Sequence, residues 1–326
     1  MIGTIDRPMT IRSTLLAIAI AIALVPTLAP VPEARAAPSA TASVRVEHHV
    51  AGAEKFRVAF VMPGQPASPL PLIVVQHGSS PTESLGTCPL FGSKQDCVRT
   101  DVFSTELVRQ AVAAGFAVAV IDAFSELGVS NQDKTRFPNA TRYAVSLVNA
   151  LRADTRFDAT RIYYTGFSYG GASVLGAISL PAAPFRAIAP VEAGCQIQPA
   201  GRRLRYPVLF VLGDRSHYPP QPCLHLTKAL QGAGTDAQAV VLEGADHNFG
   251  VGPVRSGPSR TLNGCTDNPV IVDGTGWRHL NGQRTDREEA MRTCTTFIGY
   301  GSQDATLLPT AVEHVVAFFK HHSRER

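Results

Sequence analysis

Short apolar runs alternate with stretches of helical periodicity from Ala42 to Phe319, and this alternation restricts the chain to few folds. Runs such as Pro71–Gln76 and Phe116–Ile121 are apolar almost throughout, as strands buried on both faces are. Strands that alternate with helices form a mostly parallel sheet with helices on both faces. The sequence therefore predicts an α/β protein, and ligands of such proteins bind at the carboxyl ends of the strands.

The expected elements follow one another closely along the chain. The first two strands alternate polar and apolar residues, which is typical of a half-exposed antiparallel hairpin. Strands are expected at Ser43–His48, Phe56–Val61, Pro71–Gln76, Phe116–Ile121, Arg161–Thr165, Ala187–Val191, Val208–Leu212 and Ala239–Leu242, and helices at Val102–Ala114, Arg142–Ala153, from near Tyr169, and at about Leu308–Phe319.

One segment, Gly250–Gly301, departs from this alternation because it is polar and rich in Gly and Pro. Inside it, Val270–Val272 and Trp277–His279 flank Asp273-Gly274, a typical hairpin turn. We expect this segment to be an excursion from a single domain that covers residues 37–326, and not a second domain.

The N-terminus is typical of an export signal. Arg7 and Arg12 precede Leu15–Val25, an unbroken apolar run of 11 residues, and Ala34-Arg35-Ala36 offers a small-x-small cleavage site. The apolar run is short for a helix that crosses a bilayer. We therefore expect residues 1–36 to be a signal peptide, the mature chain to be secreted or periplasmic, and no stable membrane anchor.

The charge balance argues against nucleic acid as a partner. The formal net charge is +4 over 326 residues, and the Lys and Arg residues are scattered along the chain. Nucleic-acid-binding proteins concentrate basic residues on one face or stripe. No metal, nucleotide or flavin motif occurs in the sequence either, so no cofactor is expected.

Six cysteines agree with export. An even number in an oxidising compartment is more often a set of disulfides than a metal site, and no Cys-x-x-Cys or zinc-spaced His pair occurs. Spacing along the chain favours two local pairs, Cys88 with Cys97 and Cys265 with Cys294.

The most specific chemical motif is Gly166-Phe167-Ser168-Tyr169-Gly170. It lies between the strand Arg161–Thr165 and a helix that begins near Tyr169, which is the strand–turn–helix context of a nucleophile elbow. Glycines on both sides let the backbone turn sharply, and the helix N-terminus faces the developing oxyanion. Ser168 is therefore the predicted nucleophile.

A serine nucleophile needs a base and an oxyanion hole. His247 lies in a loop directly after the last predicted strand of the sheet, and His217, His225 and His279 do not follow a buried strand as directly. His77 precedes Gly78 and is expected to fix a loop. The backbone N–H of Tyr169 is one expected oxyanion donor. The other is expected from the loop after Pro71–Gln76, where Ser79 is the candidate.

With these motifs the chain resembles the dienelactone-hydrolase group of α/β-hydrolases, from about Pro71 to Phe249 and again at the last helix. The stretches that carry the resemblance are VVQHGSS, AVAVIDAF, RIYYTGFSYGG, FRAIAPVEAGC, PVLFVLGDRSHYPPQPC and GADHNFG. FRAIAPVEAGC is also similar to secreted feruloyl-esterase and polyhydroxybutyrate-depolymerase relatives. The resemblance implies the α/β-hydrolase fold and cofactor-free hydrolysis of a small-molecule or polymeric ester, or of a lactone.

Two positions depart from the family pattern. The founding members have a cysteine where Ser168 stands, so an ordinary ester is favoured as substrate. The family also places its catalytic Asp three residues after Gly213, and Ser216 occupies that position here. The preferred acid is therefore Asp214, in the same loop, and the alternative is Glu192, at the end of the neighbouring strand.

The strand order that the resemblance implies would also bring Cys195 close to Cys223, so a disulfide is expected there. Other functions fit the same residues. A serine peptidase or an acyltransferase would use the same nucleophile and base. Ser216 at the family's acid position also leaves open a non-catalytic binding protein on a hydrolase scaffold.

Overall fold

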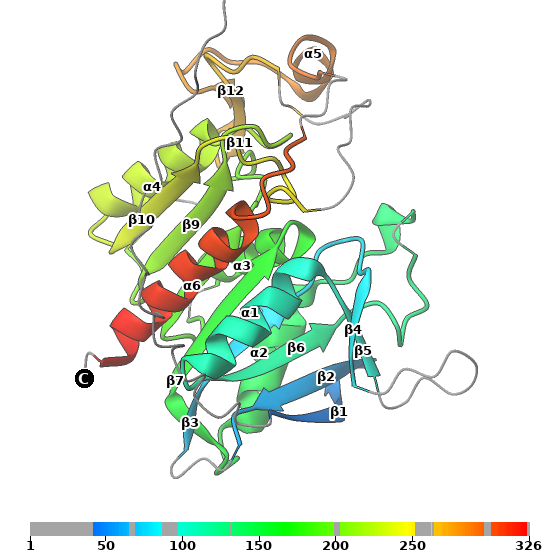
Figure 1. Ribbon diagram of the computed structural model, residues 1–326. Coiled ribbons are helices and arrows are strands. Elements are labelled where there is room, and N and C mark those ends of the chain that lie inside the picture. The colour runs from blue at the N-terminus through cyan, green and yellow to red at the C-terminus, as the bar shows by residue number, and fades with distance from the viewer. Residues whose placement is uncertain are drawn as a thin grey trace, which may run out of the picture. The chain divides into compact units, whose positions relative to one another are not determined.

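The computed structural model describes residues 42–64, 69–86, 97–130, 132–180, 182–198, 203–251, 262, 264–296 and 301–324. Its centre is a sheet of eight strands in the order β1-β2-β6-β3-β7-β8-β9-β10 (Figure 1). Strand β2 is antiparallel to both of its neighbours, and the other adjacent pairs are parallel. The strands are β1 Ser43–Ala51, β2 Glu54–Met62, β3 Leu70–Gln76, β6 Ala117–Asp122, β7 Phe157–Phe167, β8 Ala187–Val191, β9 Val208–Gly213 and β10 Ala237–Leu242.

Helices cover both faces of this sheet. On the face turned toward the viewer in Figure 1 lie α1 (Val102–Ala113) and α6 (Leu307–Arg324), and the other face is covered by α2 (Ala140–Leu151), α3 (Tyr169–Ile178) and α4 (Gln221–Gly232). Each face has its own apolar core, because the side chains of a strand alternate between the two faces. In β3, for example, residues 73 and 75 join the core beneath α1 and α6, and residues 72 and 74 join the other.

The predicted order of strands and helices is confirmed, since every expected element overlaps an observed one. The sequence interpretation missed a small antiparallel sheet of two strands, β4 (Glu83–Gly86) and β5 (Cys97–Thr100). Neither strand shows a clear alternation of apolar and polar residues, because β4 has the sequence ESLG and β5 the sequence CVRT.

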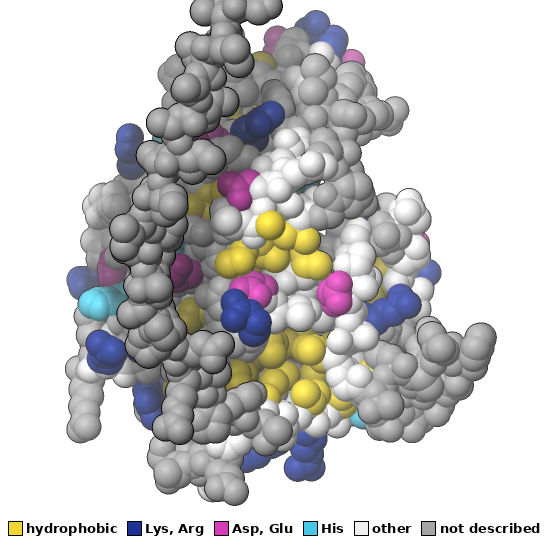
Figure 2. Space-filling view, viewed as in Figure 1, with side chains coloured by type: hydrophobic (Ala, Val, Ile, Leu, Met, Phe, Trp, Pro, Cys, Tyr) yellow, Lys and Arg dark blue, Asp and Glu magenta, His cyan; other side chains and the backbone are white. Residues whose placement is uncertain are grey.

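The surface over α1 and α6 is mixed in character. Figure 2 shows hydrophobic side chains there beside Lys or Arg and Asp or Glu side chains. In the part of the chain that the structure describes, no helix is both long and apolar enough to cross a membrane. The predicted signal peptide, residues 1–36, lies outside the described residues.

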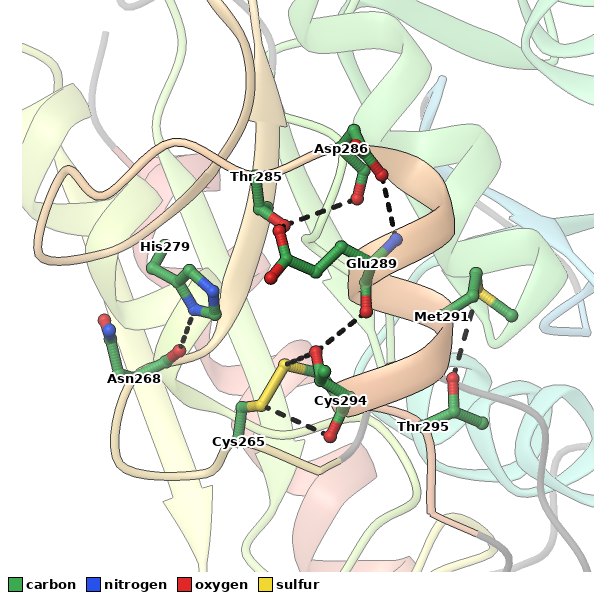
Figure 3. The surroundings of a disulfide bond; sticks show 10 residues. Cys265, Asn268, His279, Thr285, Asp286, Glu289, Met291, Cys294 and Thr295 are labelled. Atoms are coloured by element: carbon green, nitrogen blue, oxygen red, sulfur yellow. Dashed lines mark hydrogen bonds between the residues drawn. A yellow bond between two sulfur atoms is a disulfide. The ribbon is translucent and has the colours of Figure 1, made fainter.

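The excursion contains a hairpin and a short helix. The hairpin is formed by β11 (Val270–Asp273) and β12 (Gly276–His279), and the helix is α5 (Arg287–Thr293), whose N-cap is Asp286. A disulfide between Cys265 and Cys294 joins the end of α5 to the loop before β11, as predicted (Figure 3).

The hairpin is attached to the main sheet through the segment that follows β8. The Val272 N–H donates to the Gln196 carbonyl at 2.6 Å, and the Gln198 N–H donates to the Val272 carbonyl at 2.7 Å. The excursion therefore lies against the loop at the carboxyl end of β8, on the side of the sheet where a ligand is expected.

Candidate functional site

Ser168 occupies a sharp turn between β7 and α3. Its φ of 56° lies in the left-handed region, which is strained for a residue with a side chain. The flanking glycines allow this turn, because a Cβ on Gly166 would lie 2.6 Å from the Gly170 carbonyl carbon and one on Gly170 would collide with the Gln76 carbonyl oxygen. The observed turn has the strand–turn–helix arrangement expected from the sequence.

His247, in the loop after β10, connects Ser168 to a carboxylate. Its Nε2 lies 2.9 Å from Ser168 Oγ, and its Nδ1 lies 2.8 Å from Glu192 Oε2. An imidazole that donates Nδ1–H to a carboxylate has an unprotonated Nε2, which can accept the serine proton. The three side chains come from the ends of β7, β8 and β10, so the sheet itself brings them together.

Aromatic rings hold the imidazole of His247 in place. The ring centroid of Phe167 lies 5.0 Å away, that of His217 lies 4.0 Å away and that of Tyr218 lies 5.3 Å away. A ring packed by three neighbours has little freedom to rotate, so Nε2 stays directed at Ser168.

Glu192 is buried, with 1% of its surface exposed. One carboxylate oxygen accepts a hydrogen bond from the Gly213 N–H, and the other accepts from the Ser216 hydroxyl and from His247. A buried carboxylate needs such donors, because burying a charge without partners is costly.

Asp214, the acid preferred from the sequence, does not occupy this position. Its side chain is exposed. The loop after β9 instead turns Ser216, which is 4% exposed, toward the carboxylate of Glu192. The structure therefore brings the alternative candidate, Glu192, and not Asp214, to His247.

Burial shifts the pKa of both members of this pair. Desolvation lowers the pKa of His247, although the negative charge of Asp246 opposes this shift. Desolvation raises the pKa of Glu192, and the hydrogen bonds from Ser216 and Gly213 oppose that shift. A lowered pKa keeps the imidazole of His247 neutral at neutral pH, the form in which it can act as a base.

The two predicted oxyanion donors lie on neighbouring loops. Tyr169 is the first residue of α3, and Ser79 follows β3, the strand paired with β7. The loop passes close to the elbow, since a Cβ on Gly78 would lie 3.0 Å from the Phe167 ring and 3.4 Å from its carbonyl oxygen. Within the described residues, neither the Tyr169 nor the Ser79 amide donates to another protein group.

Two buried side chains fix the loop that carries Ser79. His77 donates its Nδ1–H to the Gly78 carbonyl at 2.6 Å and accepts the Ala123 N–H at Nε2 at 3.2 Å. Asp101 accepts the Ser104 N–H at 2.8 Å, as the N-cap of α1, and its other oxygen accepts the Gly78 N–H. The sequence interpretation missed Asp101, whose one visible signal is its N-cap position before a predicted helix.

The predicted disulfide between Cys195 and Cys223 is present and joins the loop that begins at Glu192 to α4. It therefore stabilises the segment that carries the carboxylate. Of the remaining predicted pair, Cys88 lies outside the described residues.

No protein-family model and no curated protein matches this sequence. Among solved structures, the chain is similar to a dienelactone hydrolase-like promiscuous phosphotriesterase from metagenomic libraries, with a TM-score of 0.54 and 17% identity, over 86% of this chain and 98% of that one. It is also similar to a puromycin hydrolase, with a TM-score of 0.51 and 15% identity, over 66% of this chain and 37% of that one. At such identities the likeness establishes the α/β-hydrolase fold, as the resemblance in the sequence implies.

Proposed function

We propose that this chain, an α/β-hydrolase by its fold, is a serine hydrolase that cleaves carboxylic esters or lactones, and that its acid is Glu192. The observation that carries this proposal is the unbroken hydrogen-bond path from Ser168 Oγ through His247 to the buried Glu192. This arrangement has the geometry and the roles of a Ser-His-acid triad.

In the acylation step, Ser168 Oγ attacks the ester carbonyl carbon while His247 Nε2 takes the serine proton. The tetrahedral oxyanion that forms is stabilised by the N–H groups of Tyr169 and Ser79. The imidazolium then gives its proton to the departing alcohol as the C–O bond breaks. Glu192 stabilises the imidazolium from the moment it forms until it protonates the alcohol, and does not itself take a proton.

In the second step, water attacks the acyl-enzyme while His247 again accepts a proton. The bond between Ser168 Oγ and the acyl carbon then breaks and the serine is reprotonated, which releases the carboxylic acid. Every proton transfer in the two steps passes through the imidazole of His247.

The mature chain, expressed from Ala37 in an oxidising compartment, should hydrolyse p-nitrophenyl esters of increasing acyl length. A fluorophosphonate should label the peptide that contains Ser168, as mass spectrometry would show. A folded protein that hydrolyses aminoacyl p-nitroanilides with higher kcat/KM than any ester would instead be a peptidase. One that neither turns over an ester nor takes up the label would be a non-catalytic binding protein.

We also propose that the enzyme is exported. The two disulfides among the described residues support this, because disulfides persist in oxidising compartments. Expression of the full sequence in a bacterial host should yield an extracytoplasmic protein whose intact mass corresponds to a start at Ala37. An exported protein that keeps residues 1–36 would contradict this.

The excursion is expected to limit the size of the acyl or alcohol group, because its hairpin is bound to the loop after β8. Replacing the hairpin residues 270–279 with a short Gly-Ser linker should broaden the acyl-length profile measured with p-nitrophenyl esters. An identical profile for the two proteins would show that the excursion is only a structural cover.

The pH dependence follows from the lowered pKa of His247. The ring can accept the serine proton only when it is neutral, so activity disappears as pH falls through its pKa. Since burial lowers that pKa from its usual 6.5, the acidic limb of kcat/KM should have its midpoint below pH 6.5. Asp246→Asn removes the negative charge that raises this pKa, so it should shift the midpoint of the acidic limb to a still lower pH. A midpoint at or above pH 6.5 in the parent enzyme would contradict this account.

Asp101→Asn is expected to lower kcat about 10-fold with little change in KM, because an amide cannot accept the Gly78 N–H as well as a carboxylate does and the Ser79 donor moves. Complete loss of one oxyanion donor costs about 10²- to 10³-fold, so a displaced donor costs less. Asp286→Asn is the matched control, because Asp286 caps α5 in the same way, through the Glu289 N–H at 2.8 Å. Equal effects of the two variants would show that Asp101 acts only as a helix cap.

A further inference from the structure

We propose that Ser216 is a positioning residue that holds the carboxylate of Glu192 against His247, and that positions 192 and 216 form one acid site whose carboxylate can come from either loop. This inference rests on the proposed function. It explains how His247 keeps a carboxylate partner although a serine stands where the family has an aspartate.

The hydroxyl of Ser216 has a defined orientation. Its Oγ accepts the Tyr218 N–H at 3.1 Å, and its own O–H is donated to Glu192 Oε2. The same Oε2 accepts the Nδ1–H of His247 at 2.8 Å. Ser216 therefore fixes the carboxylate oxygen that orients the base.

The backbone at Glu192 turns from the end of β8 toward the neighbouring strand β9, which places its carboxylate beside Ser216. The residue follows β8 with a left-handed φ of 49°, and its N–H donates to the Val211 carbonyl of β9 at 2.9 Å. Among the described residues, its carboxylate has two protein donors besides the histidine: Gly213 ends β9, and Ser216 lies in the loop after it. Glu192 follows β8, but its carboxylate is bound by the loop after β9, the loop that carries the acid in the family pattern.

Position 216 is also close enough to His247 to carry the acid. Ser216 Oγ lies 3.5 Å from His247 Nδ1, just beyond a good hydrogen bond. An aspartate at 216 would have its carboxylate carbon near the Oγ position, and its oxygens would extend roughly 1.2 Å further. With Glu192 still present, two carboxylates would compete for one site, and like charges this close cannot both ionise easily.

Removing the hydroxyl tests the positioning role. Ser216→Ala should lower kcat/KM about 10-fold or more, since a hydrogen bond to a charged group is lost, and Ser216→Thr should recover most of the activity. Ser130→Ala is the matched control, because Ser130 Oγ also accepts the N–H two residues later, that of Gln132 at 3.2 Å, in an exposed loop. Parental kcat/KM in folded Ser216→Ala would overturn the positioning role.

Exchanging the acid tests the shared site. The double variant Glu192→Gln/Ser216→Asp should hydrolyse esters at least about 10-fold faster than Glu192→Gln alone, because a carboxylate again accepts the Nδ1–H. Glu192→Gln/Ser130→Asp is the control that adds a charge elsewhere. Equal rates for the double variant and Glu192→Gln, at similar melting temperatures, would show that position 216 cannot carry the acid.

A proton NMR signal separates failure of this inference from failure of the proposed function. The downfield resonance of the His247 Nδ1–H is assigned by its loss in His247→Ala and can be measured without any substrate. It should shift in Ser216→Ala and stay in place in Ser130→Ala. If the parent hydrolyses no ester, the proposed function fails while this shift still reports on Ser216. An unshifted resonance in Ser216→Ala would overturn the inference even in an active esterase.

Discussion

Replacing Ser168 with alanine is expected to reduce kcat for p-nitrophenyl esters by about 10⁶-fold, the loss seen when the nucleophile of a serine triad is removed. The substitution deletes the one atom that forms the acyl-enzyme bond, while the oxyanion donors and the substrate contacts remain. The residual rate should therefore still exceed that of the uncatalysed reaction. Stopped assays at high enzyme concentration, after repurification to remove host esterases, would measure it.

His247→Ala should have a similar effect, and the double variant Ser168→Ala/His247→Ala should be no slower than Ser168→Ala alone. Residues that act as one unit show such non-additive losses, because the base has no function once its nucleophile is gone. Losses that multiply instead would mean that the two side chains act independently. Residual activity of Ser168→Ala above a tenth of the parent's would point to a different nucleophile and remove the proposed function.

The elbow and the base could be predicted because their signals are local. Gly166 and Gly170 are required by close backbone contacts at the turn, so the requirement is visible in five consecutive residues. His247 is identified by its place in the loop after the last strand of the sheet, which is also a property of the linear sequence. The central sheet is predictable for the same reason, since strands buried on both faces are apolar throughout.

The acid could not be decided from the sequence because its choice depends on tertiary contacts. Asp214 and Glu192 both follow buried strands, and both were compatible with the expected strand order. What separates them is the direction of the loop after β9, which leaves Asp214 exposed and directs Ser216 inward. The docking of the excursion is equally invisible in the sequence, since it uses the backbone groups of Val272 and residues 196–198.

Glu192→Gln tests the identity of the acid and is expected to lower kcat/KM by about 10³- to 10⁴-fold. The amide keeps the size of the side chain and removes the charge that stabilises the imidazolium, and the loss of a triad carboxylate has consequences of this order. Gln also brings an NH2 group into a site where Gly213 and Ser216 already donate, which disfavours the correct tautomer of His247.

Asp214→Asn is the matched control, because it makes the same chemical change one strand away on an exposed side chain. We expect it to stay within about 2-fold of the parent, as surface substitutions away from special contacts usually do. The reverse pattern, with Asp214→Asn inactive and Glu192→Gln active, would mean that the loop after β9 rearranges when substrate binds. Loss in both variants would mean that His247 needs the field of two carboxylates. Loss of activity in Glu192→Gln but not in Asp214→Asn is the one outcome that agrees with Glu192 as the acid, positioned by Ser216 from the loop after β9.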